Sequence, residues 1–208
     1  MKKFIESFLN VWKIEELKNR ILITLGFLLV YRFGAQVPLP GIDVTKLQNL
    51  TNQTDKGIGW LIDVFTGGAF SQASVFALGI MPYISASIVV QLMGIAIPYL
   101  QKLQKEGESG RKKMNQITRW LTIGITLVQG PGYIYNLYRT LPGDAFLLVF
   151  NSFSFLFSSV IILTTGTIFA MWLGEKITDK GIGNGISLLI MAGILARMPQ
   201  AFIQEFSS

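Results

Sequence analysis

Few side chains in this sequence could carry out catalysis. The chain contains no histidine and no cysteine, which excludes disulfides, thiolate or imidazole metal ligands and the usual imidazole general base. An acidic pair, Glu106 and Glu108, stands in a polar stretch without an apolar environment that would tune a carboxyl group for proton transfer. We therefore expect that this chain is not an enzyme and that it holds no metal or cofactor.

Two glycine-rich stretches superficially resemble phosphate-binding loops. Residues 181–185 read GIGNG, but a dinucleotide loop follows a strand, whereas this stretch follows a charged segment and precedes an apolar one. Residues 106–113, EGESGRKK, lack the Gly-Lys-Ser/Thr of a P-loop. We interpret the first as a tight turn and the second as a basic loop, which is either simply solvated or docks a cytoplasmic partner or lipid head groups. The candidate docking residues are Lys105, Glu106, Arg111, Lys112 and Lys113.

The composition is that of an integral membrane protein, built as a single all-α unit. Hydrophobic residues make up 50% of the 208 residues, charged residues only 14%, and the mean hydropathy is +0.48. Hydropathy predicts a polytopic bundle of five spans, each near or above the roughly 20 residues that a helix needs to cross a bilayer. The predicted spans are Ile21 to Val37, Ser71 to Ile97, Trp120 to Tyr138, Phe146 to Leu173, and Ile182 to Phe202.

The charge-free stretch between Asp63 and Lys102 predicts a broken helix. As one helix, its 38 residues would extend roughly 57 Å, nearly twice a bilayer core of about 30 Å. The pair Gly67-Gly68 supplies the break, because glycine destabilises helices and tolerates the backbone angles of a reversal. A short half-helix within residues 58–70 is then detached from the second span. Irregular backbone at membrane depth survives where it is buried in protein or lines a water-filled cavity, so this element indicates a pore or a transport path.

Lysine and arginine are distributed unequally between alternate loops. The N-terminal segment and the second and fourth loops hold thirteen of them, and the other loops hold four. The positive-inside rule then places the N-terminus in the cytoplasm. Arg32 falls within a span, close enough to its outer end for the guanidinium to reach the interface. Before the first span, Phe4, Phe8 and Trp12 recur every four residues, so residues 1–20 form either an amphipathic helix on the cytoplasmic face or an ordinary exposed lead-in.

Four groups of residues, in this order, resemble the SecY family of protein-translocation channels. They are VPLPGID at 37–43, GIMPYISAS at 79–87, EGESGRKK at 106–113, and MWLGEKIT followed by KGIGNGIS within 171–187. The resemblance runs through almost the entire chain and covers the first five of that family's ten spans. It implies a central pore subunit in the inner membrane of a bacterium, through which unfolded polypeptides cross the membrane and membrane segments leave sideways into lipid.

The resemblance also assigns roles to residues. A plug that closes the outer funnel corresponds to residues 58–70, and a ring of apolar side chains that constricts the pore corresponds to two isoleucine pairs at helical spacing. Branched aliphatic side chains around a pore offer ions and water no polar partner. A lateral gate corresponds to spans two and three, where polar side chains meet across a helix seam. The plug residues are Ile58, Trp60, Leu61, Val64, Phe65, Gly67, Gly68 and Phe70; the ring residues are Ile80, Ile84, Ile186 and Ile190; the gate residues are Ser85, Ser87 and Gln129.

For the complete channel, the resemblance implies several partners. They are SecE and SecG type small subunits, the SecA motor ATPase, the ribosome, signal peptides with their unfolded preproteins, membrane lipids, and a C-terminal half that carries spans six to ten. Two other classes remain as alternatives. A secondary transporter also uses broken helices, but it needs charged ligands at the midplane, and spans two to five place none there. A structural membrane-complex subunit would be separated from a channel by its lack of conductance.

Overall fold

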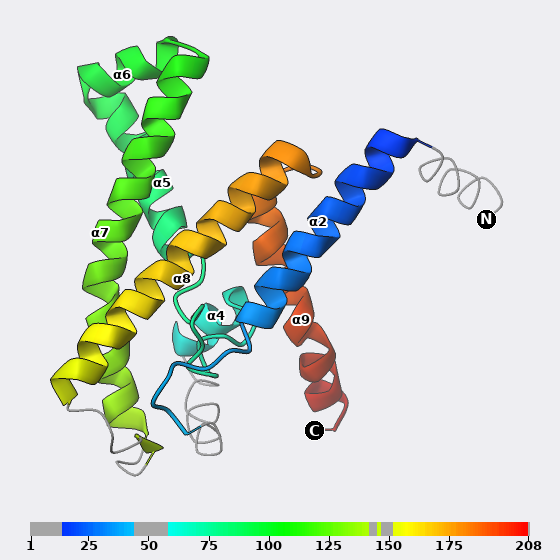
Figure 1. The fold of residues 1–208 in the computed structure, drawn as a ribbon, viewed down its shortest axis with the longest axis vertical. Coiled ribbons are helices and arrows are strands. Elements are labelled where there is room, and N and C mark those ends of the chain that lie inside the picture. The colour runs from blue at the N-terminus through cyan, green and yellow to red at the C-terminus, as the bar shows by residue number, and fades with distance from the viewer. Residues whose placement is uncertain (1–13, 44–57, 142–144, 147–151, 208) are drawn as a thin grey trace.

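The computed structural model describes residues 14–43, 58–141, 145–146 and 152–207, and these residues are all-α (Figure 1). No strand occurs in this part of the chain, where two isolated bridges, Pro38 to Ser74 and Ile42 to Phe146, pair extended backbone. The helices are α2 (Glu15–Gly34), α4 (Ile58–Phe65), α5 (Met81–Ala96), α6 (Pro98–Lys105), α7 (Glu108–Thr140), α8 (Ser152–Lys180) and α9 (Gly185–Ser207).

The long helices alternate in direction along the longest axis of the molecule (Figure 1). α2 descends in this view, α5 rises to α6, α7 descends, α8 returns and α9 descends again. The start of α2, the hairpin of α6 and α7, and the connection from α8 to α9 therefore lie toward one end. The ends of α2 and α7 and the start of α8 lie toward the other end. The short helix α4 lies between the long helices, in the half of the molecule away from α6.

Two buried clusters join the helices. In one, Ile134 and Leu137 of α7 pack against Leu163 of α8 and Leu78 of the segment that precedes α5. In the other, α2, α8 and α9 meet around Tyr31 and a set of aliphatic side chains. The aliphatic members of this second cluster include Ile80, Leu173, Ile177 and Leu189. These two clusters fix the helices that surround α4.

The second predicted span is wrong in its extent. The sequence predicts a helix from Ser71 to Ile97, whereas α5 begins at Met81 and has 16 residues. Residues 71–80 form turns instead. Within these turns Ala73 and Gly79 have positive φ angles of 47° and 52°, which no α-helix contains.

Side-chain hydrogen bonds explain why these apolar-looking residues do not continue the helix. The hydroxyl of Ser74, which is fully buried, donates to the carbonyl oxygen of Gly34 at 3.1 Å and accepts from the N–H of Phe76 at 3.0 Å. Such bonds satisfy buried backbone groups that have no helical partner. α5 then begins with Pro82 in its first turn. Proline has no N–H group, and none is needed at this position because the first helical N–H groups have no intrahelical acceptor.

The basic stretch 106–113 is not an open loop. α6 is bent by 102° from α5, and α7 begins at Glu108 after a single turn. Gly107 makes this turn with φ 68°, a conformation that glycine adopts without strain. The reversal is tight, because a Cβ atom on Gly110 would lie 1.7 Å from the carbonyl oxygen of Leu103. The candidate docking residues therefore stand, exposed, at the tip of a helical hairpin.

The count of five membrane spans remains a prediction. In the described part of the chain, one helix passes a test of length and hydropathy for crossing a membrane, at Phe153–Lys180. The bent pair of α5 and α6 passes the same test together, and Gly185–Ala196 is apolar but shorter. Of the predicted N-terminal segment, residues 1–13 lie outside the described residues, so that Phe4, Phe8 and Trp12 have no structural account, and Glu15 to Arg20 begin α2.

Candidate functional site

The predicted plug is a short helix followed by a compact set of turns. α4 ends at Phe65, and Gly67 and Gly68 follow with positive φ angles of 65° and 92°. The predicted break at the glycine pair is thus confirmed. Leu61 and Phe65 are exposed, whereas the side chains of Ile58 and Trp60 lie outside the described residues. Val64 and Phe70 are half-buried.

Hydrogen bonds to Asp63 of α4 stabilise the turns that follow this helix. Its carboxylate accepts a hydrogen bond from the N–H of Ser71 at 2.8 Å, and its carbonyl oxygen accepts from the N–H of Gly68 at 2.9 Å. The hydroxyl of Thr66 also donates to the Asp63 carbonyl, at 3.2 Å. Asp63 is only 1% exposed. A buried carboxylate is tolerated where backbone N–H groups bond to it, so α4 and its turns form one folded unit.

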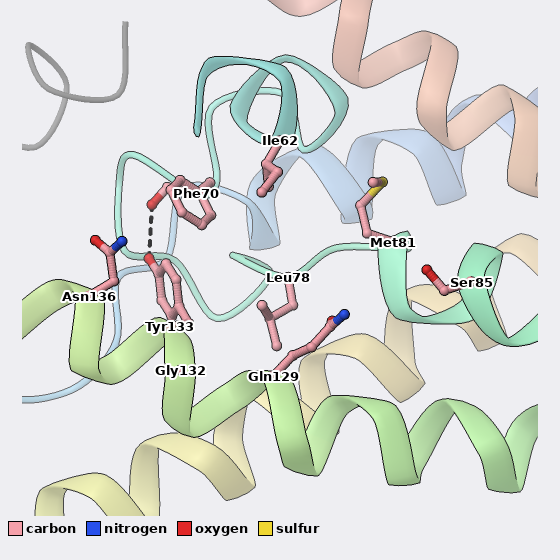
Figure 2. A pocket seen from close by; sticks show the side chains of 9 residues that line it. All are labelled: Ile62, Phe70, Leu78, Met81, Ser85, Gln129, Gly132, Tyr133 and Asn136. Atoms are coloured by element: carbon pink, nitrogen blue, oxygen red, sulfur yellow. Dashed lines mark hydrogen bonds between the residues drawn. The ribbon is translucent and has the colours of Figure 1, made fainter. Parts of the chain in front are cut away.

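Two side chains from other helices bond to this unit. Arg32 of α2 donates from Nη1 to the carbonyl oxygen of Gly67. Tyr133 of α7 donates from Oη to the carbonyl oxygen of Phe70 at 2.8 Å, as Figure 2 shows. The guanidinium of Arg32, which the sequence predicts to reach the membrane interface, thus satisfies a carbonyl group beyond the end of α4.

Glycines allow α4 to approach α9 closely. A Cβ atom on Gly67 would lie 2.9 Å from the Cα atom of Gly193, and a Cβ on Gly193 would lie 2.8 Å from the carbonyl oxygen of Phe65. Real Cβ atoms do not come this near to backbone, so any larger residue at either position would push the two elements apart. We call α4 and the turns that follow it, residues 58–70, the plug unit, after its predicted role. This unit contacts α9 directly through the backbone.

Three of the four predicted ring residues line one cavity. This cavity, of about 310 Å³, lies between α5 and α9 and is lined by Ile84, Ile186 and Ile190 together with polar neighbours. The polar lining residues include Ser87, Gln91, Asn184 and Ser187. Ile80 is 4% exposed and does not line the cavity; it belongs to the buried cluster against which Ile84 and Ile186 pack.

Two of the three predicted gate residues line a second cavity. It has a volume of about 420 Å³ and lies between α4, α5 and α7, with Ser85 and Gln129 on its wall (Figure 2). Ile62 and Phe70 of the plug segment and Tyr133 also line it. The structure places Ser87 elsewhere. Its hydroxyl accepts a hydrogen bond from Gln91 Nε2 at 3.2 Å, and both residues line the first cavity.

The glycine-rich stretch 181–185 is a short connection between α8 and α9, as the sequence predicts. Gly183 has φ 68°, and Asn184 Oδ1 accepts from the N–H groups of Ile186 and Ser187 at 3.1 and 3.2 Å. This is an ordinary helix cap, in which a side-chain oxygen satisfies the first free N–H groups. The connection therefore positions Ile186 and Ile190, the two predicted ring residues of α9.

Three functional contacts escaped the sequence reasoning. The sequence singled out Arg32, since it is a charged residue inside a predicted span, but nothing indicated its acceptor. The sequence did not single out Tyr133, because a tyrosine in an apolar helix is an ordinary residue. An ion pair also joins the start of α7 to the end of α8, where Arg119 Nε lies 3.0 Å from Glu175 Oε1 and Nη2 contacts Oε2. This bidentate pair fixes the spacing of the two helices near the basic hairpin.

Comparisons with known proteins agree with the resemblance seen in the sequence. A model of the SecY family matches residues 74–208. The chain is similar to "Protein translocase subunit SecY" of Escherichia coli K12, with 49% identity over 89% of this chain and 42% of that protein. The subunit of the same name from Buchnera aphidicola subsp. Acyrthosiphon kondoi is 49% identical over 89% of this chain and 52% of its own length. The subunit from Pseudomonas aeruginosa is 46% identical over 97% of this chain and 45% of its own length. The chain spans about half the length of these relatives.

Proposed function

Because the chain belongs to the SecY family, we propose that it supplies the plug and about half of the pore wall of a protein-conducting channel. Unfolded polypeptides would pass along the faces of α5 and α9, and apolar segments would leave toward lipid past α5 and α7, which would form one side of a gate whose partner helices belong to the other half of the channel. In this role the chain would form the passage and not a catalytic site. Movement of the polypeptide would be driven from outside the chain.

One observation carries the proposal most strongly. Ile84 on α5 and the pair Ile186 and Ile190 on α9 come from helices far apart in the sequence, yet they line one cavity. Aliphatic side chains at a constriction can give way around an extended polypeptide and offer ions no ligand when the pore is empty. The plug unit is seated on α9 and reaches the neighbouring cavity through Ile62 and Phe70. A constriction with a movable element beside it fits a gated channel.

The partners and location of the complete channel belong to the same proposal. The names of the relatives refer to a translocase, and their organisms are bacteria, which supports a bacterial membrane protein. We propose the inner membrane, with the N-terminus in the cytoplasm, and assembly with SecE and SecG type subunits. The exposed basic hairpin is proposed to face SecA or the ribosome. The remaining pore wall is proposed to come from spans six to ten.

Crosslinking of a stalled secretory precursor tests the proposed path. The chain has no cysteine, so single cysteines at Ile84 or Ile190 in the assembled channel would be the only thiols of this chain. A precursor that carries one cysteine in its translocating segment should form disulfides with both positions. Ile95, which lies on α5 but is 73% exposed and outside both cavities, serves as the matched control and should not crosslink. Equal crosslinking at Ile95 and Ile84 would contradict the proposed path.

A further inference from the structure

One predicted ring residue packs against a glycine of the neighbouring helix. Ile186 lines the cavity between α5 and α9 and also contacts α8, where a Cβ atom on Gly174 would lie 2.4 Å from its Cδ1 atom and 3.2 Å from its Cγ1 atom. Gly174 therefore leaves a notch in the surface of α8, and the end of the Ile186 side chain fills this notch. Glycine inside a helix costs stability relative to alanine, and the contact with Ile186 gives a packing reason for it.

Other contacts fix the backbone around this notch. The carbonyl oxygen of Gly174 accepts a hydrogen bond from Thr178 Oγ1 at 2.9 Å, and that hydroxyl accepts one from the N–H of Gly185 at 2.9 Å. A Cβ atom on Gly185 would lie 2.0 Å from the same carbonyl oxygen, so the start of α9 lies directly against α8. The next residue of α8, Glu175, is bound to Arg119 of α7 by the bidentate ion pair. Because α8 is tied to both α9 and α7 here, its backbone resists displacement at Gly174.

An added methyl group at position 174 would thus displace the side chain of Ile186. The Cδ1 atom is the far end of a flexible side chain and moves by rotation about its torsion angles. Leu189 is fully buried and occupies the space beside the notch, with its Cδ1 atom 3.4 Å from the added Cβ. The cavity of about 310 Å³ has room for the displaced group. The end of the Ile186 side chain would therefore turn away from α8 and into the cavity.

We propose that Gly174 is a positioning residue that sets the width of the ring on the side of α9. With glycine at this position, the Cδ1 methyl group of Ile186 lies in the notch and outside the passage. A larger residue would move this methyl group into the passage and narrow it. The inference rests on the proposed function of the ring as the constriction of a channel. It adds that a residue of α8, which does not itself line the cavity, determines how much of the cavity is open.

Thiol labelling inside the cavity tests this proposal without a precursor. Ser87 of α5 lines the same cavity, so S87C places the only cysteine of this chain on the α5 wall. The parent is S87C in the channel, assembled in membranes with partner subunits that lack cysteine. The measurement is the rate at which a small methanethiosulfonate reagent labels this cysteine. We expect G174A to lower the rate about twofold to fivefold, because the displaced methyl group crowds the cavity.

Three further variants of that parent identify the cause. G124A is the matched control, because no atom lies within 4 Å of a Cβ added to Gly124 of α7, and it should keep the parental rate. I186V removes the Cδ1 atom that fills the notch, and it should also keep the parental rate because the lost group lies outside the passage. Combined with I186V, G174A should no longer slow labelling, since its methyl group then occupies the space that Cδ1 has left.

A G174A rate equal to that of G124A would overturn the proposal. Equal slowing by G174A with and without I186V would also overturn it, because the added methyl group would then act through another residue. If G174A failed to assemble, I186V alone would still decide, since faster labelling would mean that the Cδ1 group lies in the passage and not in the notch. Failure of the precursor crosslinking described above, with the labelling results as expected, would remove the proposed path for polypeptide and leave Gly174 as the residue that positions Ile186. The two proposals can therefore fail separately.

Discussion

Ile84, Ile186 and Ile190 share a cavity whose edge is polar, with Gln91, Asn184 and other amide or hydroxyl side chains nearby. In the proposed channel, water at these isoleucines would lose hydrogen-bond partners, so a narrow apolar section would empty of water and stop ions. Hydroxyl groups in place of two isoleucines would supply such partners. On the proposed function, sealing of the resting pore would depend on these few aliphatic side chains.

At these residues we predict that I84S combined with I186S raises the resting ion leak of the complete channel several-fold. The physical reason is hydration of the constriction, and conductance in planar bilayers without any precursor measures it. I95S is the control, because Ile95 is 73% exposed and lines neither cavity. A closed-state conductance that stays at the parental value, with the channel folded and assembled, would count against the ring assignment.

Among the elements, α4 depends on close backbone contact and on bonds from two distant helices. It has eight residues, too few to be a stable helix in isolation, so its position comes from its seat on α9 and from the bonds to Gly67 and Phe70. In the proposed channel, α4 and its turns would move while α7, α8 and α9 stay folded.

We predict that G193A loosens this seat. The added methyl group would lie 2.8 Å from the carbonyl oxygen of Phe65, so the plug unit must shift, at a cost of about 1–3 kcal/mol. The measurement is the rate at which a maleimide labels a cysteine placed at Thr66 (T66C) in the assembled channel. Thr66 is 1% exposed, so this rate should rise when the unit shifts. G124A is the control: Gly124 lies within α7 with no atom within 4 Å of an added Cβ, so alanine there should leave the rate unchanged and stabilise the helix by about 0.5–1 kcal/mol. A G193A rate equal to that of G124A would contradict the close contact.

On the scale of the whole molecule, the alternating helices gather the basic segments at one end. The hairpin of α6 and α7 and the connection from α8 to α9 lie toward the same end as the start of α2 (Figure 1). These segments contain most of the thirteen lysines and arginines that the sequence assigns to one side. The positive-inside rule predicts a cytoplasmic location of that end.

We predict that a cysteine at Ser109 is shielded from an impermeant maleimide added outside intact cells, whereas one at Gln36 reacts. Both side chains are exposed, and they stand near opposite ends of the molecule, on the hairpin of α7 and just after the end of α2. Permeabilised cells give the control, in which both positions must react. The reverse pattern in intact cells would mean that the chain is inserted the other way round.

The sequence was sufficient for features that depend on neighbouring residues. The all-α class, the break at Gly67-Gly68 and the turn at 181–185 follow from apolar runs and glycine positions, and the structure confirms them. Sequence reasoning failed at residues 71–80, where apolar composition predicts helix. Buried serine hydroxyls there bond to backbone groups, and hydropathy does not register such bonds.

Tertiary structure alone decided which side chains meet. Ser85 and Ser87 look equivalent in sequence, but two residues of a helix turn the direction by about 200°, so they line different cavities. Arg32 and Tyr133 bond to carbonyl groups that are 35 and 63 positions away along the chain. A carbonyl group is present at every residue, so no residue type marks it as the acceptor. The sequence by itself determined the helices and the broken element between them, and only their packing determined which donors hold that element in place.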